Sequence, residues 1–205
     1  NWPHTQMSGN EGEIEGDEDD DEGYTGDPLV VPGNVPELKD VRYLHGLFPE
    51  SFLRELDDLR LETPTFSGSH NMYADRRFLR SDDLAGRVLA YLRHLGFQHV
   101  LSDMRFIEYP PGGHILAHVD GVRVDDVTFL PSTTSMLLFT ETVPEGEGGE
   151  TEFLDTLEDA EGPSAKVLFA ARPKRGSILL FPHAVPHRGQ CVGTWAKILL
   201  RGDLY

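Results

Sequence analysis

The pattern of apolar side chains changes at Gly96, and this change constrains the fold more than any other feature of the sequence. Before it, two segments carry apolar residues at helical spacing, which predicts helices over Pro49–Leu61 and Asp82–Leu95. Ser81 is suited to cap the second helix and Gly96 to end it. After Gly96 the chain consists of short runs typical of β-strands.

Turns rich in Pro, Gly and Glu separate these runs from one another. The predicted strands are Met104–Tyr109, Ile115–Val119, Ser135–Thr140, Thr151–Leu154, Val167–Ala171, Ser177–Phe181 and Ala196–Arg201. Helices followed by strands, without regular alternation, indicate helices packed on a β-sandwich or barrel. We therefore predict a mainly β (α+β) fold, a double-sheet jelly roll with N-terminal helices on one sheet.

Acidic residues are concentrated near the N-terminus. The net charge is −17, and residues 1–38 contain eleven acidic side chains and no Lys or Arg, which leaves −17 + 11 = −6 for residues 39–205. Like charges at this density repel one another and leave little to bury. The sequence predicts a disordered acidic tail over residues 1–36 that could dock a basic partner, followed by one domain over residues 37–205.

Composition also disfavours several classes of partner. The sequence shows no basic footprint for nucleic acid and no apolar run near the ~20 residues that span a bilayer. Its single cysteine, Cys191, cannot form an intramolecular disulfide. This favours a cytoplasmic or nuclear location, although a chain starting at Asn1 is also compatible with a leader that has been removed.

The candidate metal ligands are two histidines and one aspartate. His118 and Asp120 are two residues apart in a predicted strand and should face the same side. A second histidine would complete a triad of two His and one carboxylate, which leaves positions open on Fe(II) for a cosubstrate and oxygen. We favour His187 for this role, with His183 as its competitor beside the ligands or at the surface. His114 competes with His118 but has no carboxylate two residues later.

A lysine interrupts the last apolar strand. Lys197 follows His187 by ten residues, and a charge there is costly unless it meets an anion or reaches the surface. The far carboxylate of a metal-chelated dicarboxylate would be such an anion. Arg201, roughly 13 Å further along the strand, is the alternative anchor. Its other expected role is a structural pair with Asp203.

Three stretches of the chain resemble the 2-oxoglutarate/Fe(II)-dependent oxygenases of the prolyl 4-hydroxylase-like group, of the alpha-subunit catalytic domain type. They begin Arg105-Phe-Ile-Glu-Tyr109, Met136-Leu-Leu-Phe-Thr140 and Gly176-Ser-Ile-Leu-Leu-Phe181, and run through the histidines, lysine and aspartates described above. The resemblance covers about residues 40–205, in order and at compatible spacings.

This resemblance implies a double-stranded β-helix core and assigns roles to single residues. His118, Asp120 and His187 would bind iron, Lys197 would bind 2-oxoglutarate, and Tyr109 would hydrogen-bond its carboxylate. The implied activity couples O2-dependent oxidative decarboxylation of 2-oxoglutarate to hydroxylation of an unactivated C–H bond. Succinate and CO2 would be released, with ascorbate as the expected reductant.

The resemblance favours a prolyl or other side chain of a protein or peptide as substrate. A free amino acid or small metabolite would use the same triad. Two alternatives of other kinds are a non-catalytic metal-binding jelly roll that serves as an interaction module, and a cupin that binds another metal through His114, His118 and His187.

The segments Ser67–Arg80 and Asp120–Thr134 should flank the metal as a substrate-binding lid. Three arginines in them could grip an acidic group or a backbone carbonyl of a substrate: Arg76, Arg77 and Arg123. Thr151 and Phe153 are expected to serve packing alone.

Overall fold

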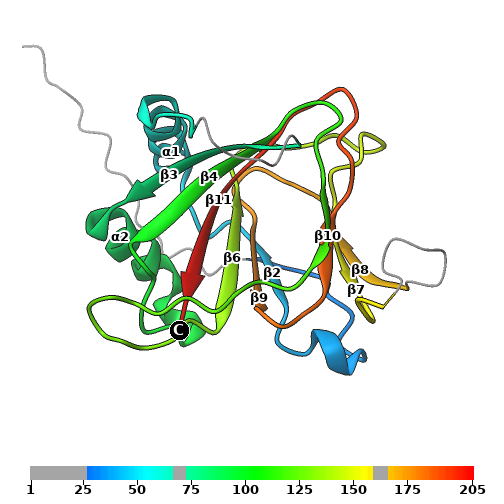
Figure 1. Ribbon diagram of the computed structural model, residues 1–205, viewed down its shortest axis with the longest axis horizontal. Helices are drawn as coiled ribbons and strands as arrows, with labels where there is room; N and C mark the ends of the chain where they lie inside the picture. Colours follow the sequence, from blue (N-terminus) through cyan, green and yellow to red (C-terminus); the bar gives the residue numbers. More distant parts are fainter. Residues whose placement is uncertain (1–26, 67–72, 159–165) are drawn as a thin grey trace, which may run out of the picture.

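The computed structural model describes residues 27–66, 73–158 and 166–205, and within them the strands form two antiparallel sheets (Figure 1). The larger sheet has the strand order β1-β2-β9-β6-β11-β4-β3, and the smaller one β5-β10-β7-β8. The strands are β1 (Asp27–Leu29), β2 (Arg42–His45), β3 (Asp75–Arg80), β4 (Asp103–Tyr109), β5 (Ile115–His118), β6 (Thr134–Phe139), β7 (Thr151–Leu154), β8 (Val167–Ala171), β9 (Ile178–Pro182), β10 (His187–Gly189) and β11 (Lys197–Leu204).

Both predicted helices are present. They are α1 (Glu50–Glu62) and α2 (Asp82–Leu92), and short 3-10 turns, η1 (Pro36–Leu38) and η2 (Arg93–Leu95), accompany them. The Ser81 hydroxyl accepts a hydrogen bond from the Leu84 amide at the start of α2, and Gly96 adopts a left-handed conformation after η2. Among the described residues, no helix is long and apolar enough to cross a membrane.

Alternating side chains on the central strands explain why the sheets and helices stack. On β6, Met136 and Leu138 pack against the helices, whereas Leu137 and Phe139 face the smaller sheet. In Figure 1 the large sheet accordingly lies between α1 and α2 on one side and β7, β8 and β10 on the other. The prediction of a mainly β jelly roll with helices on one sheet is confirmed.

The strand β11 lies between β6 and β4 and follows the same alternation. Its Leu200 packs on the helix side, and Leu199 faces the other sheet. By the same parity Lys197 and Arg201 point into the space between the sheets, where they line one cavity. A strand buried on both faces thus delivers two cations to the interior.

Four strands lie outside the predicted set. Strand β1 pairs with β2, so regular structure reaches back to Asp27, ten residues before the predicted domain start at residue 37. Its three residues carry no apolar alternation that could have indicated a strand. The predicted tail up to residue 26 lies outside the described residues.

The predicted lid Ser67–Arg80 is partly a strand. Its segment Asp75–Arg80 is the edge strand β3, and residues 67–72 lie outside the described residues.

Burial of α2 against the sheet should dominate the stability of the helical side. Leu92 is fully buried in this core, whereas Leu61 on α1 is 65% exposed. We expect Leu92→Ala to lower the free energy of unfolding by about 2–5 kcal/mol, because it removes apolar contacts and leaves a cavity. Urea unfolding should show a much smaller effect for Leu61→Ala, and equal losses in the two variants would contradict this packing.

Candidate metal centre

Two paired strands bring the predicted metal ligands together. His118 ends β5, His187 begins β10, and the two residues are direct partners in the antiparallel register. Asp120 follows in the loop after β5. Its Oδ1 lies 3.8 Å from Nε2 of His118, and its Oδ2 lies 3.8 Å from Nε2 of His187. One ligand atom from each of the three residues lies within 4.8 Å of the others.

Backbone hydrogen bonds set the orientation of both imidazoles. Nδ1 of His118 lies 2.8 Å from the Leu116 carbonyl oxygen, and Nδ1 of His187 lies 2.9 Å from that of Val185. Because a carbonyl oxygen only accepts, each Nδ1 carries a proton, which leaves Nε2 as the nitrogen through which the neutral ring can bind a metal. Burial, with a contribution from neighbouring His118, lowers the pKa of His187 to about 4, which keeps this imidazole neutral and able to bind a metal.

Asp120 is held in its charged form. Burial alone would raise its pKa, but Arg201, whose Nη2 is 3.3 Å from Oδ1, and a hydrogen bond from the Ser135 hydroxyl to Oδ2 hold the pKa below its usual value. Two imidazoles and one carboxylate match the donor set of non-haem Fe(II) sites. The residues present therefore fit an iron ion of this kind.

His183, the competitor for the distal ligand, supports Asp120 from behind. Its Nδ1 is 2.8 Å from the Ser135 hydroxyl, and its Nε2 is 2.8 Å from that of Ser132. Since Ser135 donates its proton to Asp120, it accepts from Nδ1–H of His183, and Nε2 accepts from Ser132. The His183 carbonyl also accepts from the Asp120 amide at 2.9 Å. His183 thus orients the carboxylate without belonging to the triad.

His114 is directed elsewhere. Its ring lies against that of Tyr73, with centroids 4.1 Å apart, and its Nδ1 is 3.1 Å from the Gly112 carbonyl oxygen. Within the described part of the chain the metal-competent group comprises His118, Asp120 and His187. The cupin alternative, which required His114, has no support in this geometry.

Lys197 is buried between the sheets and is 3% exposed. Its Nζ donates to the Thr151 hydroxyl at 3.0 Å and lies over the rings of Tyr109 and Phe139, 5.4 and 5.7 Å from their centroids. Burial lowers the pKa of Lys197 to about 7, opposed by the charge of Glu150. The expectation that Thr151 serves packing alone is wrong, because its hydroxyl is the hydrogen-bond partner of this ammonium group.

The remaining cosubstrate candidates lie in the same cavity. It has a volume of about 470 Å³, counting the part open to solvent, and is lined by the triad together with Lys197, Tyr109 and Arg201. Tyr109 on β4 is the direct register partner of Lys197. Arg201 donates to Asp203 at 2.7 Å and lies beside Asp120, so it occupies the structural role foreseen as its alternative.

The three arginines predicted to contact a substrate beside the metal point in different directions. Arg76 on β3 lines the cavity, but its neighbour Arg77 points the other way and donates to the Thr63 carbonyl at 2.7 Å, so its predicted role is wrong. Arg123 lines a neighbouring hollow. Arg105, which the sequence analysis missed, lines both spaces. The available signal was its spacing of four residues from Tyr109 on one strand face.

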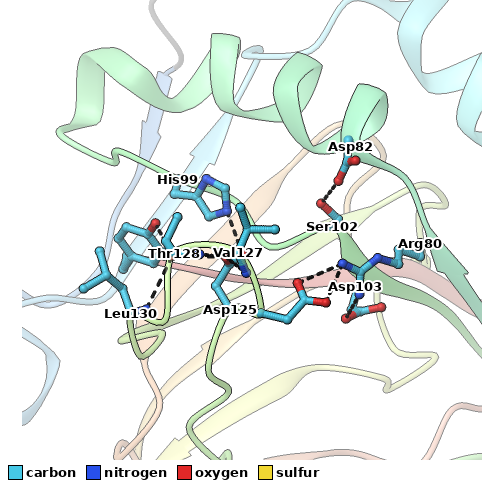
Figure 2. A network of polar contacts seen from close by, with 11 residues as sticks. Arg80, Asp82, His99, Ser102, Asp103, Asp125, Val127, Thr128 and Leu130 are labelled. Carbon is cyan, nitrogen blue, oxygen red and sulfur yellow. Dashed lines mark hydrogen bonds and ion pairs between the residues drawn. The ribbon is translucent and has the colours of Figure 1, made fainter.

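Hydrogen bonds and ion pairs hold the middle of the loop between β5 and β6, which was predicted as a lid (Figure 2). Asp125 accepts from the Thr128 amide at 2.7 Å and from Nε2 of His99 at 2.9 Å. The backbone hydrogen bond from Thr128 is the main cause that lowers the pKa of Asp125 to about 2. Next to it, Arg80 on β3 pairs with Asp126 at 2.7 Å. These contacts fix the loop to the edge of the large sheet.

Neither a scan of protein-family models nor a search of curated proteins finds a match to the chain. Its fold does match solved structures. A collagen prolyl hydroxylase from Paramecium bursaria Chlorella virus-1, in complex with 2-oxoglutarate, has a TM-score of 0.58 at 16% identity over 83% of this chain and 97% of its own. A prolyl-4-hydroxylase from Pseudomonas putida gives 0.57 at 16% identity over 82% and 94%.

A third solved structure contains a bound small molecule besides 2-oxoglutarate. HygX from Streptomyces hygroscopicus, with nickel, 2-oxoglutarate and hygromycin B bound, has a TM-score of 0.59 at 11% identity over 80% of this chain and 82% of its own. The chain therefore has the fold of the 2-oxoglutarate/Fe(II) oxygenases, a fold shared by prolyl 4-hydroxylases. At these identities the likeness defines the fold and leaves the chemistry to the site.

The hydrogen bond from Ser135 should contribute to metal affinity through Asp120. We expect Ser135→Ala to weaken Mn(II) binding on the order of tenfold to a hundredfold, because the carboxylate loses a partner that orients it. Calorimetric titration of the protein with Mn(II) would measure this. Ser177→Ala is the matched control, since that serine is equally buried but bonds His45. Equal affinity in all three proteins would contradict the proposed support.

Proposed function

We propose that this protein is an Fe(II)- and 2-oxoglutarate-dependent oxygenase that hydroxylates an unactivated C–H bond. The observation that carries the proposal is the presence, in one cavity, of a two-histidine, one-carboxylate triad and a buried lysine without a carboxylate bound to it in an ion pair among the described residues. A metal site alone would not need the lysine, and burying its ammonium form without an anion is costly.

In this proposal one group of residues binds the metal and another binds the cosubstrate. His118, Asp120 and His187 would hold iron, which when bound supplies activation of O2 coupled to oxidation of 2-oxoglutarate. Lys197 and Thr151 would bind the far carboxylate of 2-oxoglutarate through charge-assisted and neutral hydrogen bonds. The apolar walls around Lys197 keep water away from this carboxylate and so strengthen the interaction.

For the prime substrate we propose a prolyl or other side chain of a peptide. The two prolyl hydroxylases among the structural neighbours support this choice, and HygX, whose structure contains hygromycin B, supports a small molecule as the second candidate. The non-catalytic alternative is less well supported, since a site without activity would have no need for triad and lysine together. We propose residues 37–205 as the oxygenase domain; the pairing of β1 with β2 supports extending it back to Asp27.

Turnover would test the proposal directly. The protein, purified without oxygen and supplied with Fe(II), ascorbate and air, should form succinate from 2-oxoglutarate. We expect His187→Ala to abolish this activity and Lys197→Ala to raise the KM for 2-oxoglutarate by at least about tenfold, since a buried charge-assisted contact is lost. Lys39→Ala, at an exposed lysine, is the control. Absence of both turnover and 2-oxoglutarate binding in the parent protein would refute the function.

Binding of 2-oxoglutarate should weaken as the pH rises above 7. The ammonium form of Lys197 binds the dicarboxylate, and with a pKa of about 7 the empty site loses this proton at higher pH. Binding must then take up a proton, so the apparent Kd should rise by up to about tenfold per pH unit. Calorimetry on the Mn(II) protein from pH 6 to 9 would measure it. Lys197→Arg should remove the dependence, because a guanidinium stays charged; a flat profile in the parent protein would contradict the mechanism.

A further inference from the structure

The cavity of the candidate metal centre contains more positive charge than the proposed reaction requires. Its lining includes five cations, Arg76, Arg105, Arg188, Lys197 and Arg201, and one acid, Asp120. Clusters of like charge inside a protein are unfavourable unless anions neutralise them. The question is therefore which of these cations already has an anion.

Four of the five cations have a partner or a proposed one, and Arg76 is among them because it makes a contact of its own. Arg201 pairs with Asp203 at 2.7 Å, and Arg188 pairs with Glu152 at 2.7 Å. Under the proposed function, Lys197 takes the far carboxylate of 2-oxoglutarate. The two positive charges of iron would be balanced by Asp120 and by the chelating carboxylate of the cosubstrate. Among these anions, Asp203 keeps one oxygen, Oδ1, without a hydrogen bond, but it forms no ion pair with Arg105 among the described residues.

Arg105 itself has no acceptor among the described residues. Its Nε is buried without a hydrogen-bond partner, and its guanidinium forms no ion pair with any described residue. Asp203 and Asp120 attract it from a distance, but both already pair with Arg201. Burial, and next the repulsion from Arg201, lower the pKa of Arg105 to about 10, so the side chain remains charged at neutral pH.

The position of Arg105 separates it from the cosubstrate anchor. On β4 it lies opposite Arg201, whereas Tyr109 lies opposite Lys197, which places the two cations roughly 13 Å apart along the sheet. Arg105 also lines an adjacent hollow of about 490 Å³ together with Phe78 and Arg123. It therefore stands between the metal cavity and the surface, at the end of the cavity opposite Lys197.

We propose that the prime substrate carries a carboxylate, which Arg105 binds while the C–H bond to be hydroxylated lies at the metal. This inference rests on the proposed function and names the substrate class of the same site. The exposed ring of Phe78 offers an apolar surface beside the bound group. The carboxylate has two sources: an acidic residue near the target side chain of a peptide, or the acid group of a small molecule.

Two pairs of probe mixtures would test the proposal, each differing in one carboxylate. The first pair is a randomised heptapeptide pool with a fixed central glutamate or a fixed central glutamine. The second pair is a mixture of the twenty N-acetyl amino acids, which have a free α-carboxylate, and a mixture of the corresponding amides, which do not. The readout is succinate formation above the level without substrate, using the full chain with Fe(II) and ascorbate.

We expect the acidic member of one pair to stimulate turnover at least about tenfold more than its neutral counterpart. A preference in the first pair would identify an acidic peptide, and one in the second a small acid. Arg105→Gln should abolish the preference and Arg105→Lys should restore part of it, whereas Arg54→Gln, at an exposed arginine on α1, should keep it. Equal stimulation within both pairs, or a preference that survives Arg105→Gln, would overturn the proposal.

Binding of 2-oxoglutarate distinguishes this failure from failure of the proposed function. We expect Arg105→Gln to bind 2-oxoglutarate with an affinity within about threefold of the parent in calorimetry on the Mn(II) protein. If binding weakens as much as in Lys197→Ala, Arg105 belongs to the cosubstrate site and the substrate proposal falls. If the parent binds 2-oxoglutarate normally but prefers no acid, only the substrate proposal falls. If the parent neither binds nor consumes 2-oxoglutarate, both the proposed oxygenase function and the proposed substrate class are wrong.

Discussion

The two sheets bury the ammonium group of Lys197, and the groups that surround it in the interior follow from the cost of burying that charge. An ammonium group removed from water is costly unless it is neutralised, paired or deprotonated. Here one hydroxyl, that of Thr151, and the faces of Tyr109 and Phe139 surround it, and its pKa falls to about 7. The site is thus poised between a neutral amine and a cation, and an arriving carboxylate would shift it to the charged form.

The fold and the candidate metal triad were predictable because their signals are local. A histidine and an aspartate two residues apart at the end of a strand stay close together, and here His118, the last residue of β5, and Asp120, in the loop after it, lie close enough to hold one metal ion. Apolar runs such as Met136–Phe139 indicate strands covered on both faces, which is what a sheet between helices and a second sheet requires. Lys197 was conspicuous for the same reason, as the one charge at the head of such a run.

The residues that were missed depend on contacts between distant segments. The spacing of Arg105 from Tyr109 indicates a shared strand face, but only the register between β4 and β11 places Arg105 opposite Arg201 in the cavity, and no local pattern specifies that register. Thr151 matters because the second sheet places its hydroxyl against Lys197. The strand β3 shows the converse difficulty. Each of its faces carries both charged and apolar residues, so nothing in its sequence revealed that Arg76 points into the cavity and Arg77 toward the end of α1.

The strand β11 joins the two halves of the large sheet, although it follows all the other strands in the chain. Its pairing with β4 connects residues about 90 positions apart, such as Ile107 and Leu199, and closing a loop of that length is slow and costs entropy. Until β11 inserts, β4 and β6 present open edges on which wrong strands can pair. Because Lys197 belongs to this strand, the proposed anion site exists only once β11 has paired with both β4 and β6.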